Sequence, residues 1–193
     1  MGEVEGEIRN EQLDAEREAR RRAALAQIRQ YPDPVLRMEA REVREFDEAL
    51  ADLVERLTRL MQEANGIGLA APQVGVTRRV FVYQPAEDAP VVALVNPRVT
   101  SASEELETSD EGCLSLGAAT VVVPVERPQR VTVEGSSPQD EPLVVEVEGL
   151  EARVVQHEID HLDGVLIVDR AAPEHRRAAL GQLRPRPVLS AFA

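Results

Sequence analysis

The sequence contains no lysine and no tryptophan, and it has one cysteine, Cys113, among 193 residues. A single cysteine excludes an internal disulfide, so Cys113 is core filler, a nucleophile or a metal ligand. No apolar run approaches the roughly 18 residues that span a bilayer, which argues against a membrane protein. Residues 1–7 resemble neither a secretory signal nor a transit peptide, and we therefore expect a cytoplasmic protein.

The charge balance is strongly acidic. Against 35 aspartates and glutamates stand 22 basic residues, all of them arginine, for a formal net charge of -13. Such a field repels phosphate backbones and therefore predicts no DNA binding and no attachment to anionic membranes. Hydrophobic residues make up 43% of the chain, which excludes disorder throughout.

The chain divides into three parts. Residues 1–27 are rich in glutamate and arginine with few apolar positions, and they predict a solvated helical arm. Tyr31-Pro32-Asp33-Pro34 ends that helix because prolines force an extended turn. A globular domain is expected over residues 28–170, followed by a C-terminal helix and tail over residues 171–193.

Hydrophobic periodicity predicts an α+β fold. Apolar residues at helical spacing predict an amphipathic helix over residues 47–64, and a second helix is expected over residues 150–162. Several short antiparallel strands should pack around this second, central helix. The expected strands cover residues 79–83, 91–95, 120–123, 130–134 and 143–147, and a short helix covers residues 173–183.

The second helix carries an H-E-x-x-H pattern, with His157, Glu158 and His161. Residues four apart lie on one helical face, so both imidazoles can reach one cation while Glu158 faces its water. A metal lowers the pKa of water towards about 7, and an adjacent carboxylate can take up the proton. The pattern favours metal-assisted hydrolysis; the alternative is two unrelated surface histidines.

Two histidines leave a catalytic site one protein ligand short, and Cys113 is the best candidate for the third. A thiolate and two imidazoles suit a borderline-soft divalent ion with an open fourth position. The alternative for Cys113 is a small buried hydrophobe, the commonest fate of a free cysteine.

Small residues dominate the segment Gly66-Ile67-Gly68-Leu69-Ala70-Ala71-Pro72-Gln73. Phosphate binding is a weak interpretation because the segment lacks the endings of known phosphate loops. We expect instead that a substrate approaches the backbone closely, and that the amide of Gln73 stabilises a developing oxyanion. A turn or cap amide is the alternative for Gln73.

Three segments together resemble the signature motifs of the peptide deformylases. They are the Gly66 to Gln73 segment, Glu111-Gly112-Cys113-Leu114-Ser115, and the segment from Gln156 to Gly164. The resemblance covers residues 28 to 170. Within this range, Tyr31-Pro32-Asp33-Pro34-Val35-Leu36-Arg37 also resembles the N-terminal segment of the family. Each motif alone could mislead, but all three occur in the order of the family.

The resemblance implies removal of the formyl group from N-formylmethionyl nascent peptides, with release of formate. It implies one divalent metal, usually Fe²⁺, with Zn²⁺, Ni²⁺ or Co²⁺ as alternatives, and in some relatives a C-terminal segment that docks on the ribosome. The implied metal ligands are Cys113, His157 and His161; Glu158 is the general acid/base, and Gln73 with the Leu114 N–H forms the oxyanion pair. The implied substrate-binding residues are Gly66, Ile67, Gly68, Glu111, Gly112, Leu150 and Val154.

One loop departs from the family pattern. After Ser115 the chain reads Leu116-Gly117-Ala118-Ala119-Thr120, and about two extra residues precede Arg127-Pro128. We expect Arg127 to pair with Asp160 behind His161. Two other functions stay open: an endopeptidase whose third ligand is Asp169 or Glu174, and a catalytically silent metal-binding module whose altered loop over residues 116–125 excludes substrate.

Overall fold

The computed structural model describes residues 2–86 and 88–183, with side chains from residue 14 onward. The elements run in the order α1 (Gly2–Leu25), η1 (Pro34–Arg37), α2 (Glu48–Glu63), β1 (Gly68–Ala70), η2 (Ala71–Val74), β2 (Val80–Tyr83), β3 (Val92–Ala102), β4 (Leu106–Gly112), β5 (Val122–Pro128), β6 (Arg130–Ser136), β7 (Pro142–Glu148), α3 (Gly149–Leu162), α4 (Ile167–Arg170) and α5 (Pro173–Gln182). The predicted α+β class is confirmed.

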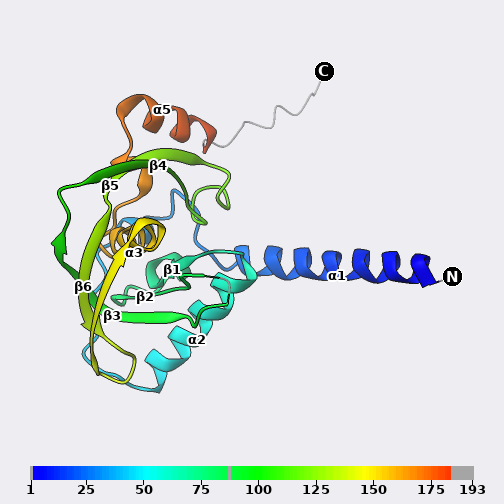
Figure 1. Cartoon of the computed structure of the whole chain (residues 1–193), viewed down its shortest axis with the longest axis horizontal. Helices are drawn as coiled ribbons and strands as arrows, with labels where there is room; N and C mark the ends of the chain where they lie inside the picture. Colours follow the sequence, from blue (N-terminus) through cyan, green and yellow to red (C-terminus); the bar gives the residue numbers. More distant parts are fainter. Residues whose placement is uncertain (1, 87, 184–193) are drawn as a thin grey trace.

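Two antiparallel sheets enclose α3 (Figure 1). Five strands form one sheet in the order β1-β2-β3-β6-β7, and β4 pairs with β5 in the other. The inner face of α3 packs Ala152, Val155 and Ile159 against Phe81 and Leu94 of the large sheet. Burial of this apolar stripe fixes the rotation of α3 and therefore the direction in which its polar face points.

The amphipathic helix α2 covers the opposite side of β1 and β2. Asp47 caps it by accepting a hydrogen bond from the backbone N–H of Leu50 at 2.9 Å. Leu50, Leu57 and Leu60 are fully buried, as the spacing predicted. The helix ends before Asn65, whose φ of 55° turns the chain into the glycine-rich segment.

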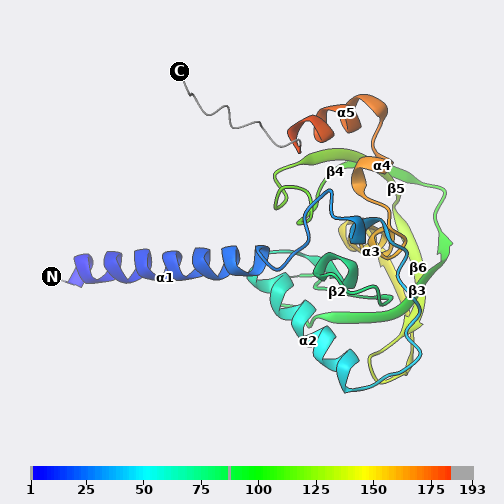
Figure 2. The same ribbon diagram turned by 180° about the vertical axis from the view of Figure 1, so that it is seen from behind.

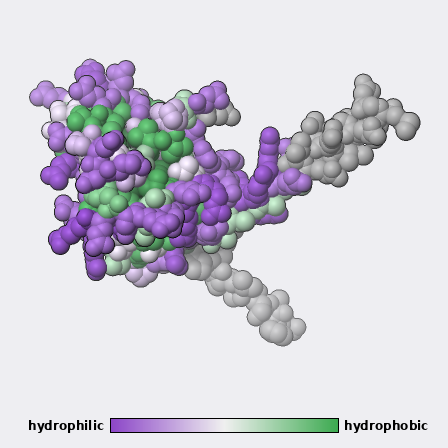
Figure 3. Space-filling model, turned by 90° about the horizontal axis from the view of Figure 1, so that it is seen from below, coloured by the Kyte–Doolittle hydropathy of each residue, from purple (hydrophilic) through white to green (hydrophobic). Residues whose placement is uncertain are grey.

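The helix α1 extends away from the body (Figures 1 and 2). Its C-terminal end is anchored to the body: Ala24 is buried there, and Ile28 is buried just beyond it. Residues 14–20 are exposed, and the described part of the arm is mainly hydrophilic (Figure 3). None of the helices among the described residues is long and apolar enough to cross a bilayer.

The strand predictions were wrong in four places. The strand expected over residues 91–95 begins at Val92 and continues to Ala102 as β3. The strand expected over residues 120–123 begins at Val122 and continues to Pro128 as β5, because Gly117, Ala118 and Ala119 all have positive φ and form a loop before it. The sequence prediction missed β4, whose seven residues include only one that is buried. It also missed β1, which has only three residues. The tail beyond residue 183 lies outside the described residues.

Candidate metal and catalytic site

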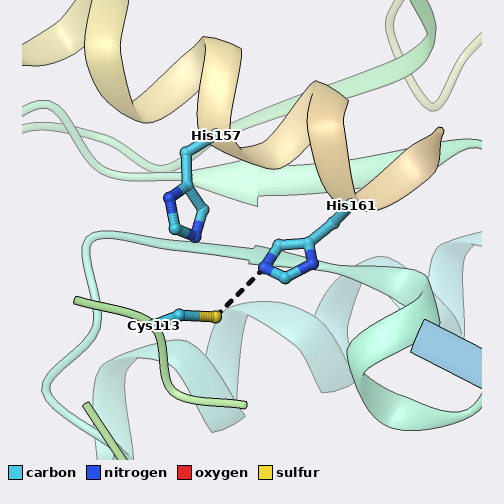
Figure 4. Close-up of side chains that lie close together, drawn as sticks. All are labelled: Cys113, His157 and His161. Atoms are coloured by element: carbon cyan, nitrogen blue, oxygen red, sulfur yellow. Dashed lines mark hydrogen bonds between the residues drawn. The ribbon is translucent and has the colours of Figure 1, made fainter. Parts of the chain in front are cut away.

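One turn of α3 brings two imidazoles together. His157 and His161 lie four residues apart, with ring centroids 5.0 Å apart and nearly perpendicular planes. The Sγ atom of Cys113 lies 3.2 Å from Nε2 of His161 (Figure 4). One ligand atom from each of the three residues falls within 4.8 Å of the other two.

Cys113 enters the site from a different element. It follows directly after β4, and its side chain is buried with 3% exposure. The structure therefore brings together the three residues that the sequence nominated as ligands, although 44 positions separate Cys113 from His157. A thiolate with two imidazoles is a donor set that suits zinc, iron or another borderline-soft divalent ion, so these residues fit the predicted metal.

Glu111 orients the first histidine. Its Oε2 lies 3.0 Å from Nδ1 of His157, which leaves Nε2 as the free ring nitrogen. Arg127 also donates two hydrogen bonds to this carboxylate, at 2.7 and 3.0 Å, and Arg153 donates another at 2.8 Å. Burial raises the pKa of Glu111, but the bonds to His157 and Arg127 outweigh it and lower the pKa to about 2. Glu111 is therefore a carboxylate at neutral pH.

The same arginine connects Glu111 to the far end of the motif. Arg127 Nη1 donates to Asp160 Oδ2 at 2.8 Å, so the predicted contact is confirmed. Arg170 donates to both oxygens of the Asp160 carboxylate. Arg127, Glu111 and Asp160 are all buried, and this network fixes the end of β4 and β5 against α3.

Glu158 lies beside the ligands with 4% exposure, and its Oε2 has no hydrogen-bond partner among the described residues. Burial raises the pKa of Glu158 to about 7. A carboxyl with such a pKa can both accept and donate a proton near neutral pH. Gly68 makes this position possible, because a Cβ there would lie 2.4 Å from Oε1 of Glu158.

The two histidines have opposite pKa shifts. Burial lowers the pKa of His161 well below its usual range, and the charges of His157 and Arg127 lower it further. Burial also acts to lower the pKa of His157, but hydrogen bonds to Cys113 and Glu111 raise it well above that range. Metal binding to His157 would therefore displace a proton.

Gln73 makes the cap-like hydrogen bond considered from the sequence and lies beside the ligand cluster, where its oxyanion role stays a prediction. Its Oε1 accepts a hydrogen bond from the Ala70 N–H at 2.8 Å, as a cap does. Its Nε2 donates to Ser115 Oγ at 3.2 Å and lies 3.8 Å from Cys113 Sγ. An amide nitrogen carries two hydrogens, so Nε2 donates one to Ser115 and the other to the Cys113 sulfur, which places this donor directly beside the candidate metal ligands. No acceptor is found for the Leu114 N–H within the described chain, which leaves a second donor there.

A cavity of about 260 Å³ opens beside these groups. All seven predicted substrate-binding residues line it, and so do Asn65, Asp110, Ala119 and Arg153, which the sequence did not nominate. Two apolar residues on its lining, Ile67 and Leu150, are 45% and 62% exposed. The cavity lining thus combines exposed apolar side chains with two of the candidate metal ligands, Cys113 and His157.

Sequence reasoning missed the role of two buried side chains. It assigned Glu111 only to substrate binding and did not consider Arg153. The available signal was the charge pattern: Arg153 lies four residues before His157 on α3, so both side chains lie on the same helical face. A carboxylate on the cysteine segment could have been inferred as their partner.

Comparisons with known proteins give one consistent result. The family model described as polypeptide deformylase matches residues 25–177. A peptide deformylase of Acidothermus cellulolyticus is 47% identical over 161 residues, which are 83% of this chain and 87% of that protein. One from Natranaerobius thermophilus is 45% identical over 148 residues, covering 77% and 93%.

Solved structures agree with these matches. The crystal structure of peptide deformylase from Thermotoga maritima superposes with a TM-score of 0.72 at 44% identity, covering 76% of this chain and 97% of that chain. The enzyme from Synechococcus elongatus, solved in complex with actinonin, gives a TM-score of 0.76 at 36% identity, covering 82% and 91%.

Proposed function

Because the chain belongs to the polypeptide deformylase family, we propose that the cavity beside Cys113, His157 and His161 is where it removes formyl groups from peptides. The family consists of metal-dependent hydrolases that deformylate N-formylmethionyl peptides, and the chain is such a hydrolase. The observation that carries the assignment is the convergence of one sulfur and two nitrogens next to a buried carboxyl of raised pKa.

Cys113, His157 and His161 would hold the metal, and Fe²⁺ is the ion we propose. A bound divalent ion supplies a Lewis acid that lowers the pKa of water and polarises the formyl oxygen. The chain contributes a prepared geometry: the Glu111 carboxylate fixes the His157 ring, and Asp160 with Arg127 supports α3 behind His161. Zn²⁺, Ni²⁺ and Co²⁺ suit the same donor set.

Glu158 moves the proton. Its carboxylate accepts a proton from the attacking water and then donates it to the departing amine, so one group acts as base before collapse and as acid after it. The raised pKa of about 7 suits both steps near neutral pH. Burial keeps bulk water from exchanging that proton.

Gln73 and Leu114 stabilise the negative charge on the former carbonyl oxygen. The side-chain Nε2 of Gln73 and the backbone N–H of Leu114 are neutral donors fixed before substrate arrives. Loss of one oxyanion donor typically lowers kcat by about 10²- to 10³-fold. The methionine side chain would contact Ile67, Leu150 and Val154 on the cavity wall.

Replacement of the thiol tests the assignment. We expect Cys113→Ala in protein loaded anaerobically with Fe²⁺ to lose bound metal and formate release from a formyl-Met peptide. His175→Ala is the matched control, because the third histidine lies exposed on α5 and outside the ligand cluster. A silent metal-binding module would release no formate even when the wild-type protein is fully loaded.

The same variant separates the endopeptidase alternative, which places the third ligand at Asp169 or Glu174. Asp169 instead pairs with Arg37 and Arg176 and accepts from the Leu166 N–H. Retained metal and peptide-bond cleavage in Cys113→Ala would favour the endopeptidase.

A ribosome-docking role for the C-terminal segment, which carries Arg176, Arg177, Arg184 and Arg186, stays a prediction. Arg176 and Arg177 lie on α5, and Arg176 pairs with Asp169 at 3.3 Å. Arg184 and Arg186 lie outside the described residues. Truncation after Asp169 with retained co-sedimentation with ribosomes would contradict it. Residence in the cytoplasm and the division at residues 27 and 170 likewise stay predictions.

A further inference from the structure

Three consecutive residues between the arm and the globular body contact both loops that carry the oxyanion donors. The backbone N–H of Arg29 donates to the carbonyl of Gln73 at 2.7 Å. The side-chain Nε2 of Gln30 donates to the carbonyl of Leu114 at 2.9 Å. The backbone N–H of Tyr31 donates to the carbonyl of Ser115 at 2.9 Å.

The Gln30 contact differs from its two neighbours because it depends on a side chain. Any residue other than proline supplies the backbone N–H groups at positions 29 and 31, whereas only a donor of suitable length at position 30 reaches Leu114. The Gln30 side-chain oxygen also lies 3.4 Å from the Ala118 N–H. Gln30 lies outside the three motifs of the site.

The Leu114 peptide needs such a contact. Peptide planarity places the Leu114 N–H opposite the Cys113 carbonyl, and that carbonyl accepts from the N–H groups of Leu116 and Ala119, both at 2.9 Å. The plane before Leu114 is therefore held from within its own loop. The next plane, which carries the Leu114 carbonyl, is held by Gln30, and the two planes share the Leu114 Cα.

The loop that holds the first plane is itself strained. Ala118 and Ala119 have φ values of 54° and 65°, a left-handed conformation that costs a non-glycine residue free energy. Release of this strain would move the Ala119 N–H away from the Cys113 carbonyl. The Gln30 amide contacts this loop at Ala118 and holds the following peptide at Leu114, so it opposes both movements.

We propose that Gln30 is a positioning residue for the oxyanion site: its side-chain amide fixes the Leu114 peptide and so directs the Leu114 N–H at the oxygen that becomes negative. The inference rests on the proposed function of the site. Gln30 itself is neither one of the candidate metal ligands nor one of the residues that line the cavity, so it acts through the Leu114 peptide and the loop at Ala118. Because the contact stabilises the transition state more than bound substrate, its loss should lower kcat and leave KM unchanged.

The test compares Gln30→Ala with Gln27→Ala in the full-length, Fe²⁺-loaded chain. Gln27 is an exposed glutamine three residues earlier, and among the described residues its side chain bonds only the carbonyl of Ala23. Loss of the exposed hydrogen bond to the Leu114 carbonyl predicts a fall in kcat of about 2- to 10-fold for Gln30→Ala and none for Gln27→Ala. KM and metal content should stay at wild-type values, and the thermal midpoint should fall by no more than the few degrees that one lost exposed hydrogen bond costs. Gln30→Lys, which restores a donor, should recover part of kcat.

A second readout does not depend on turnover. Amide hydrogen exchange at Leu116, Ala118 and Ala119 should accelerate in Gln30→Ala and stay unchanged in Gln27→Ala. Wild-type kcat in Gln30→Ala, or a fall in kcat that accompanies lost metal or a midpoint lowered by more than a few degrees, would overturn the positioning role. A wild-type chain that releases no formate would instead refute the proposed function, so the two failures are distinguishable.

Discussion

A methyl group at Gly68 should disable the site without removing the metal. In the native structure the carboxylate of Glu158 occupies the space where a Cβ would stand, with Oε1 at 2.4 Å, Cδ at 2.8 Å and Cγ at 2.9 Å from it. Ordinary contact begins at 3.4 Å, so the Glu158 carboxylate must retreat by about 1 Å, the difference between 3.4 and 2.4 Å, in Gly68→Ala. Glu158 is buried on α3, and the retreat changes its position relative to the substrate.

A displacement of about 1 Å at a catalytic group typically costs about 10²-fold in rate. Because a tenfold change corresponds to about 1.4 kcal/mol, the expected loss in transition-state stabilisation is ~2.7 kcal/mol. No atom of the candidate metal ligands Cys113, His157 and His161 is among the three nearest neighbours of this methyl group, so the metal content should not change. Formate release with saturating formyl-Met peptide measures the effect, with metal analysis on the same samples.

Two further variants define the result. Gly181→Ala is the control, since a Cβ there meets nothing within 4 Å and lies on α5, and it should keep wild-type activity. In a Glu158→Gln background, Gly68→Ala should cost little more, because effects through one group are not additive. Activity of Gly68→Ala within threefold of wild type, or a large additional loss when it is combined with Glu158→Gln, would refute the steric argument.

Two stability predictions concern the buried ion network. Arg127→Ala leaves Glu111 and Asp160 buried without their shared cation and should lower the free energy of unfolding by about 3 kcal/mol. This value is at the low end for a broken buried ion pair because Arg153 still contacts Glu111. Urea denaturation at pH 7 measures the change. The pKa of Glu111 is lowered from 4.5 to about 2 on folding, so its stabilisation is present above pH 4.5 and lost as pH falls towards 2. The shift corresponds to at most about 3 kcal/mol. A metal-free protein equally stable at pH 2.5 and pH 6, or a Glu111→Gln variant with the same acid sensitivity, would contradict this.

Local patterns were enough for the longer helices and for half of the site, although they missed the four-residue helix α4. The i, i+4 spacing of His157 and His161 specifies a shared face on any helix, and the apolar stripe of α3 decides that this face points away from the large sheet. The same reasoning located α2, where the leucines follow the helical period. Such features depend on residues within two turns of one another.

The contacts that complete the site depend on pairing that no local pattern encodes. The strand β4 reads Leu-Glu-Thr-Ser-Asp-Glu-Gly, a run of weak strand formers, and it is a strand because all seven residues pair with β5. The position of Cys113 follows from that pairing. The sequence could therefore name Cys113 as the missing ligand only through the ligand count and the family resemblance.

Sequence reasoning also failed to predict that the charged side chain of Glu111 is buried. From sequence, an acidic strand that begins with exposed residues predicts a solvated face, and Glu111 would be one more exposed acid. The structure buries it because two arginines and an imidazole converge on its carboxylate. A single strand or helix cannot reveal this, since the partners come from β5 and α3, and only the assembled fold offsets the desolvation of the charge.

Glu111 also explains how ligands on separate elements stay in register. It lies two residues before Cys113 on one chain segment and bonds His157 on the other, so the same short segment supplies both a ligand and the group that orients a second ligand. The backbone distance between Glu111 and Cys113 is fixed by β4, and the rotation of α3 is fixed by its apolar face. Together these constraints hold Sγ of Cys113 near the imidazoles through protein contacts alone, which reduces the ordering cost of binding an ion there.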